Sequence, residues 1–262
     1  MSTGRPSRAE SGADPGAEAR RTAIPQPPPA ERARTVAARA SATLHAVGVG
    51  AVALSVAGTT AAGQVLVVVP ADGRLAAALR TSPLGDLPAR LTVIDRSPFA
   101  VRHPVRGQVE LSGWLTPVHP ADVQRCLLDL ADVRPSDVLL DVGLGAVLLR
   151  LDLAEVLLTD AGTTSEIDPD DFAAARPDPL GPDDVDLAAG HGEPLDRLLE
   201  RVQAWAGRRD AVRLLGLDRF GVRFRVEGHG SCHDLRVPFA EPLTAGTGLG
   251  AALDTLLTCG PA

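Results

Sequence analysis

Residues 214–242 read LLGLDRFGVRFRVEGHGSCHDLRVPFAEP, and residues 248–257 follow them as GLGAALDTLL. Apolar and polar residues alternate over 212–217 and again over 221–226, on either side of a turn that ends in Gly221. Alternation with period two around a glycine turn predicts an antiparallel hairpin. A third run at 234–239 and the pattern of 248–257 add a strand and a helix, so the last quarter of the chain predicts a small sheet with a helix.

The composition is that of a globular chain with a substantial core. The chain has 262 residues, of which 45% are hydrophobic and 23% charged, enough for one large or two small domains. Arginine is the basic residue throughout, because lysine is absent. A Schiff-base enzyme and a lysine-bearing phosphate loop both need that amine, so both classes are excluded.

Charge and cysteine content narrow the partners and the location. A net charge of −7 and an aromatic content of 3% disfavour nucleic acid, which needs cationic contacts and stacking rings. The apolar run 46–57 is shorter than the ~20 residues that span a bilayer, so no membrane association is expected. Cys126, Cys232 and Cys259 are far apart and odd in number, which indicates a reducing cytoplasm.

The order of segments predicts a barrel followed by a smaller domain. Residues 1–30 mix Gly, Ser, Pro and Arg without periodicity and predict a disordered tail. A barrel domain with an N-terminal helix is expected at 31–165, a linker with a short helix at 166–182, and the C-terminal domain at 183–262. Within the barrel, the patterns predict a helix at 31–45, short strands and a helical insert between 47 and 118, a helix at 120–131, and strands at 138–143 and 146–160.

Three motifs carry a resemblance to a known family. RGQVELSGWL at 106–115, LDRFG at 217–221 and LRVPF at 235–239 resemble the pyridoxamine 5′-phosphate oxidase-like, FMN-binding split-barrel superfamily. The C-terminal order of elements is similar to its haem-utilisation branch, with a small C-terminal domain of unknown function. The resemblance implies an α+β fold: a split β-barrel followed by a small α/β domain of helix, antiparallel hairpin and helix. It also implies a homodimer formed through the barrel.

The resemblance implies a planar cofactor, with haem ahead of FMN. The stretch 70–80, PADGRLAAALR, lacks the family's Ser/Thr- and Lys-containing phosphate segment. Either cofactor would need arginine partners, whose planar fork pairs bidentately with phosphate or propionate. Arg90 and Arg106 lie at predicted strand ends, and Trp114 could cover a planar ring. The alternative is that the arginines are surface residues and the tryptophan belongs to the core.

Histidines of the C-terminal segment are the candidate iron ligands. His229 and His233 lie with Cys232 and Asp234 in EGHGSCHDL, and imidazole and thiolate can bind zinc or haem iron. Their spacing matches no standard zinc or haem-attachment motif, so a solvated loop is the alternative. His191 lies where the resembling domain carries histidines and is the first choice for a haem ligand, against a plain helix-end histidine.

Three functions stay open at this point. The resemblance favours a cytoplasmic protein that binds haem or a similar planar cofactor, in haem utilisation or degradation. A flavin-dependent oxidoreductase of the pyridoxamine-phosphate oxidase type is the second. A non-catalytic regulatory module that has lost its cofactor and acts through a protein partner is the third, and the missing phosphate segment favours it. The sequence identifies no catalytic residue.

Overall fold

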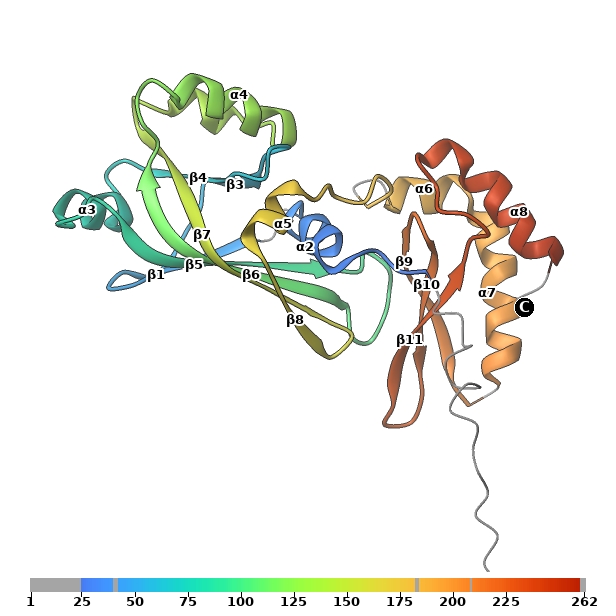
Figure 1. Cartoon of the computed structure of the whole chain (residues 1–262). Helices are drawn as coiled ribbons and strands as arrows, with labels where there is room; N and C mark the ends of the chain where they lie inside the picture. Colours follow the sequence, from blue (N-terminus) through green and yellow to red (C-terminus); the bar gives the residue numbers. More distant parts are fainter. Residues whose placement is uncertain (1–24, 40–41, 182–183, 208, 260–262) are drawn as a thin grey trace, which may run out of the picture.

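The chain folds into two parts that lie side by side (Figure 1). This computed structural model describes residues 25–39, 42–181, 184–207 and 209–259. The predicted N-terminal tail lies outside the described residues up to residue 24. The larger part holds one curled sheet, and the smaller part holds a three-stranded sheet with helices against it.

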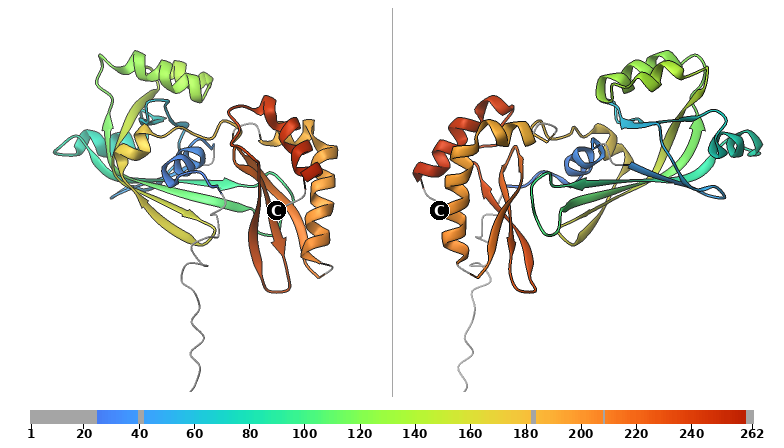
Figure 2. Two further views of the ribbon diagram at one scale, coloured as in Figure 1. Left: turned by 45° about the vertical axis from the view of Figure 1, so that its right-hand side comes forward. Right: turned by 180° about the vertical axis from the view of Figure 1, so that it is seen from behind.

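The larger sheet is antiparallel and forms a half-barrel (Figures 1 and 2). Its strands are β1 (Ala42–Ala46), β2 (Gly50–Val52), β3 (Val56–Thr59), β4 (Val65–Pro70), β5 (Leu87–Arg96), β6 (Val105–Pro117), β7 (Ala146–Asp160) and β8 (Thr163–Ile167). They are ordered β2-β1-β5-β6-β7-β4-β3, and β8 pairs with β7. A bulge between β6 and β7 falls at Gly113, where an added Cβ would lie 2.0 Å from the Asp152 carbonyl oxygen. Only glycine permits that approach, and the bulge helps to curve the sheet.

Helices cover both faces of this sheet. They are α2 (Pro29–Ala37), α3 (Arg74–Thr81), α4 (Val123–Val133) and α5 (Pro169–Ala174). On the inner face, alternate residues of β5 are buried, and Ala33 of α2 and Phe172 of α5 pack in the same core. On the outer face, Cys126 and Leu130 of α4 pack on Leu66 of β4. Elsewhere this face is open to solvent along β5 and β6, where Arg90 and Trp114 are exposed.

The smaller part has its own hydrophobic core. Its elements are α6 (Asp184–Gly190), α7 (Gly192–Ala206), β9 (Ala211–Asp218), β10 (Gly221–Glu227), β11 (Cys232–Pro238), the 3-10 turn η2 (Gly246–Gly248) and α8 (Leu249–Cys259). The sheet order is β11-β10-β9, and α7 and α8 contact each other beside it. Phe224 of β10, Leu198 of α7 and Leu253 of α8 meet in this core. The predicted α+β fold, a barrel sheet followed by a small sheet with helices, is confirmed, and the barrel sheet is a curled antiparallel half-barrel.

The helix expected at 31–45 differs from the structure. It begins at Pro29, inside the segment assigned to the tail, and ends at Ala37. Residues 42–46 form β1 instead, because pairing with β5 places Leu44 opposite Leu91 in the core. Burial of Leu44 in the sheet outweighs the helix propensity of its neighbours.

The strand expected at 138–143 is also different. Residues Asp137–Asp141 form a 3-10 turn, η1. The Ser136 side chain accepts a hydrogen bond from the Val138 amide and so caps the start of the turn.

None of the helices in the described ranges is long and apolar enough to cross a membrane.

Candidate functional site

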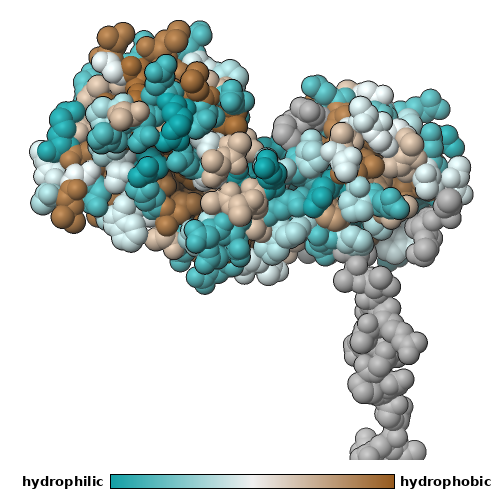
Figure 3. Space-filling view, turned by 45° about the horizontal axis from the view of Figure 1, so that its top comes forward, coloured by the Kyte–Doolittle hydropathy of each residue, from teal (hydrophilic) through white to brown (hydrophobic). Residues whose placement is uncertain are grey.

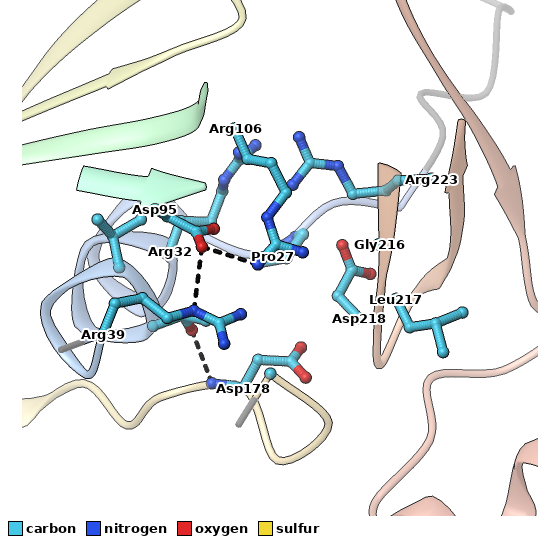
Figure 4. Close-up of a pocket in the computed structure, with 13 residues that line it drawn as sticks. Pro27, Arg32, Arg39, Asp95, Arg106, Asp178, Gly216, Leu217, Asp218 and Arg223 are labelled. Carbon is cyan, nitrogen blue, oxygen red and sulfur yellow. Dashed lines mark hydrogen bonds and ion pairs between the residues drawn. The ribbon is translucent and has the colours of Figure 1, made fainter. Parts of the chain in front are cut away.

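Arginine and aspartate side chains fill the junction between the two parts. Figure 4 shows them turned toward one another, from α2 and the strand ends of the larger sheet on one side and from β9 and β10 on the other. They surround a cavity of about 40 Å³. Its charged lining residues are Arg32, Arg39, Asp95, Arg106, Asp178, Asp218 and Arg223. In the space-filling view the surface at this junction is mostly hydrophilic (Figure 3).

Arg106 links the two parts. It is 5% exposed and donates to Asp95 Oδ1 at 2.7 Å, to Asp184 Oδ2 at 2.5 Å and to the Leu215 carbonyl oxygen at 3.3 Å. Burial lowers the pKa of its guanidinium, but the two carboxylates outweigh burial and raise the pKa above its ordinary value. Because Asp184 begins α6 and Leu215 lies in β9, these bonds join β6 to the smaller part.

Two arginines of α2 and its end add to the network. Arg39 Nε lies 3.1 Å from Asp95 Oδ1, and its Nη2 lies 3.6 Å from Asp184 Oδ2. Arg32 pairs with Asp160 at the end of β7. Burial, followed by the charges of Arg223 and Arg236, lowers the pKa of Arg32 to about 10.

The smaller part supplies the other half of the network. Arg223 Nη2 lies 3.5 Å from Asp234 Oδ2 and 3.7 Å from Asp160 Oδ1. Arg219 donates to Glu31 of α2 at 2.9 and 2.6 Å, a bidentate pair across the junction. Paired charges from both parts therefore fix their relative position.

Asp178 is the buried acid of the linking segment. Its carboxylate accepts hydrogen bonds from the Arg219 amide at 3.0 Å and the Leu180 amide at 2.8 Å. Burial raises the pKa of this carboxyl; the two amides oppose this effect, and the nearby charges of Asp218 and Glu31 add to it.

The size of the junction cavity limits what it can hold. Pockets for small-molecule ligands have volumes of roughly 300–1,000 Å³. A single water molecule needs only a cavity of about its own size. A cavity of about 40 Å³ has room for water and not for an organic cofactor. The arrangement here joins the two parts, and a cofactor contact of Arg106 stays a prediction.

Arg90 and Trp114 lie together on the open outer face of the larger sheet. Arg90 is opposite Ser112, and Trp114 lies two residues further along β6, so both side chains project from the same face. Arg90 Nη1 lies 3.1 Å from Glu110 Oε2 on that face. Trp114 is 48% exposed, so it is a surface residue rather than part of the core.

His191 lies between α6 and α7 and is half-buried. Its Nδ1 lies 2.8 Å from the Leu187 carbonyl oxygen. An added Cβ on Gly250 of α8 would lie 3.5 Å from its Nε2. The ring is therefore held between the α6–α7 junction and the start of α8.

His229 and His233 are exposed residues of the hairpin between β10 and β11. Cys232 is exposed with a free thiol, whereas Cys126 is free and buried. No group of three or more His, Cys, Asp or Glu residues within the described ranges is arranged to hold a metal ion. The six predicted site residues thus fall in four places: the junction, the outer sheet face, the α6–α7 junction and the hairpin.

Sequence reasoning missed the partners of Arg106. Asp184 and Leu215 are 78 and 109 residues away along the chain, so no local spacing brings them together. Arg32 and Arg39 are seven residues apart, the spacing that places two side chains on one face of a helix. That spacing could have indicated a shared position, but a polar helix face is normally solvent-exposed and does not point to a buried network.

Comparison with known proteins supports the fold. No protein-family model matches the chain, and no curated protein matches it. Among solved structures, the heme binding protein from Mycobacterium smegmatis is similar with a TM-score of 0.60 and 21% identity, over 89% of this chain and 97% of that chain. At this identity the likeness shows a shared fold over both parts of the chain.

Two further structures match with lower scores. A protein of unknown function from Agrobacterium tumefaciens matches with a TM-score of 0.42 and 19% identity, over 88% of this chain and 96% of that chain. The FAD and heme binding protein from Mycobacterium smegmatis matches with a TM-score of 0.38 and 15% identity, over 55% of this chain and 76% of that chain.

Proposed function

We propose that this protein binds haem, or a planar cofactor of the same kind, with one axial histidine from its smaller part. The fold likeness to a heme binding protein over 89% of this chain supports the proposal. The observation that carries it is the hydrogen-bonding state of His191.

The His191 ring has the arrangement of a metal-binding histidine. A carbonyl oxygen can only accept, so the 2.8 Å contact to Leu187 places a proton on Nδ1, and in the neutral ring Nε2 then carries the lone pair. Histidines that bind metals usually donate their other ring nitrogen in this way. Gly250 of α8 lies beside Nε2, and an added Cβ there would be 3.5 Å from this nitrogen. An imidazole whose other ring nitrogen is held in this way is a suitable axial donor for a haem iron.

The remaining contacts would come from the surface. Arg90 and the half-exposed Trp114 lie on one open sheet face. In a dimer, this face of one copy could contact a haem bound by His191 of the other copy. We therefore include a homodimer formed through the barrel in the proposal. Haem would supply the iron chemistry, while this chain would bind and orient the haem and provide the imidazole.

Haem titration of the purified apoprotein tests the ligand. Wild type should give a saturable Soret shift, and His191→Ala should weaken binding by about tenfold or more and change the Soret position, since iron loses its axial nitrogen. His103→Ala is the matched control, because His103 is an exposed histidine of the larger part and is not a predicted ligand. Equal spectra and affinities for all three proteins would overturn the assignment.

A cofactor-free regulatory module is the second candidate. The observation that favours it is that both predicted arginine partners already pair with acids, Arg106 with Asp95 and Asp184 and Arg90 with Glu110. The absorption spectrum of the protein purified from cells separates the candidates. A Soret band supports haem binding, and a flavin spectrum supports the oxidoreductase alternative. A colourless protein that does not bind added haem supports the cofactor-free regulatory module.

A further inference from the structure

An arginine-lined cavity of about 330 Å³ lies on the larger part, beside α2. Its walls come from the end of α2, the turn after β3, the end of α4 and the segment after α5. Arg34, Arg134 and Arg176 line it together with Thr59 and Thr60. The cavity contains none of the residues predicted to bind haem, and its function does not depend on that proposal.

Among the residues that the structure describes, Arg34 is a buried cation without a carboxylate partner. It is 3% exposed, and it donates from Nη2 to the Thr60 carbonyl at 2.8 Å and from Nε to the Ala175 carbonyl at 3.1 Å. Its guanidinium carbon lies 5.3 Å from the centroid of the Phe172 ring. Nη1 is buried and makes no hydrogen bond to a described residue. Burial, followed by the charge of Arg176, lowers the pKa of this guanidinium.

Arg134 is held at the same cavity by close packing. Gly58 of β3 lies against α4: a Cβ there would be 2.8 Å from Leu130 Cδ1 and 3.0 Å from Arg134 Cγ. The absence of a side chain at position 58 lets the end of α4 approach the strand. Arg134 Nη2 donates to the Ala38 carbonyl, and burial, followed by the charge of Arg39, lowers the pKa of its guanidinium.

The charges at this cavity are not balanced as they are at the junction. There, Arg106, Arg39 and Arg223 each have carboxylate partners within 4 Å. Within the described ranges, Arg34, Arg134 and Arg176 form no ion pair, and the lining contains no acid. Carbonyl groups satisfy some of their N–H donors but bring only partial charges. Buried charges in proteins are normally paired, so a bound anion would complete this arrangement.

We propose that this cavity binds the oxyanion group, carboxylate or phosphate, of a small molecule. Arginine forks recognise both groups bidentately, and a volume of about 330 Å³ is at the lower end of small-molecule pockets, which are roughly 300–1,000 Å³. Val133 and Pro177 give the cavity an apolar wall for the rest of the ligand. Arg176 is exposed and Arg134 is half-buried, so both can meet an entering ligand, with the charge of Arg34 behind them.

Calorimetric titration of the full chain at low salt tests this site, with inorganic phosphate and succinate as the two probes. We expect saturable binding of at least one probe. Arg176→Gln and Arg134→Gln should each weaken it by about tenfold to a hundredfold, the usual effect of losing a charged hydrogen bond. Arg125→Gln is the matched control, because Arg125 is an exposed arginine of α4 that already pairs with Asp122. Its affinity should equal that of wild type.

The outcomes separate the two sources of the oxyanion. Binding of phosphate alone identifies a phosphorylated ligand, and binding of succinate alone identifies a carboxylate ligand. Binding of both supports a site that recognises either oxyanion. Binding of neither probe overturns the proposal. Equal weakening by the Arg125 control would also overturn it, because the effect would then be due to net charge. Circular dichroism of each variant confirms that it is folded.

Discussion

Replacing Arg106 with methionine should strongly destabilise the protein. Methionine keeps much of the apolar stem but removes the guanidinium that lies between Asp95 and Asp184. These two acids are 6% and 1% exposed, so the variant leaves two buried carboxylates close together. Each loses one charged hydrogen bond from the arginine.

The magnitude follows from the contacts that remain. Removing one partner of a buried ion pair costs about 3–5 kcal/mol. Arg39 still lies 3.1 Å from Asp95 and 3.6 Å from Asp184, so we expect the lower end of that range, about 3 kcal/mol. For a chain of this size, that corresponds to a fall in Tm of roughly 6–12 °C.

Urea unfolding followed by circular dichroism measures this free energy. Arg125→Met is the control, since Arg125 and its partner Asp122 are 57% and 45% exposed and solvent screens such a pair. Its urea midpoint should equal that of wild type. An Arg106→Met midpoint within error of wild type, at an unchanged slope, would refute the role given to the junction network.

Gly216 provides a second test of the same reasoning. A Cβ at this position of β9 would lie 2.4 Å from Arg106 Nη1. Gly216→Ala should therefore displace the guanidinium and destabilise wild type, and it should have a smaller effect when Arg106 is already methionine. Equal effects in both backgrounds would show that Gly216 acts independently of Arg106.

Two further predictions concern pH and assembly. Burial raises the pKa of the Asp178 carboxyl above its ordinary value of 3.8, so the unfolded chain loses this proton first and stability declines as the pH rises from about 4; Asp178→Asn should lack that decline. Urea midpoints at about pH 4 and about pH 7 measure it, and an identical pH dependence in both proteins would contradict it. We also expect a homodimer by light scattering at micromolar concentration, and Trp114→Glu should convert it to a monomer because a charge would replace an exposed ring on the open sheet face. A monomeric wild type, or a variant that stays dimeric, would exclude this face as the interface.

Local patterns in the sequence were sufficient for the smaller part of the fold. The alternation around residues 218–221 predicts β9 and β10 with the turn between them, and the structure pairs Gly221 with Asp218 there. The start of α5 was also predictable, since Asp168 caps it by accepting from the Asp170 amide and Pro169 begins the helix. Such elements depend on contacts within a few residues, which a sequence shows directly.

The sequence by itself determined the α+β class, the absence of lysine chemistry and the positions of most elements, because periodicity and composition act locally. Only the tertiary structure placed Leu44 in a strand, since the pairing with Leu91 that buries it comes from a distant segment. The same holds for the two arginine clusters. Arg106 and Arg34 have equal charges in the sequence, but long-range folding gives one two buried carboxylates and leaves the other beside an arginine-lined cavity. The partner of a charge is decided by which segments pack against it, and that is a property of the fold.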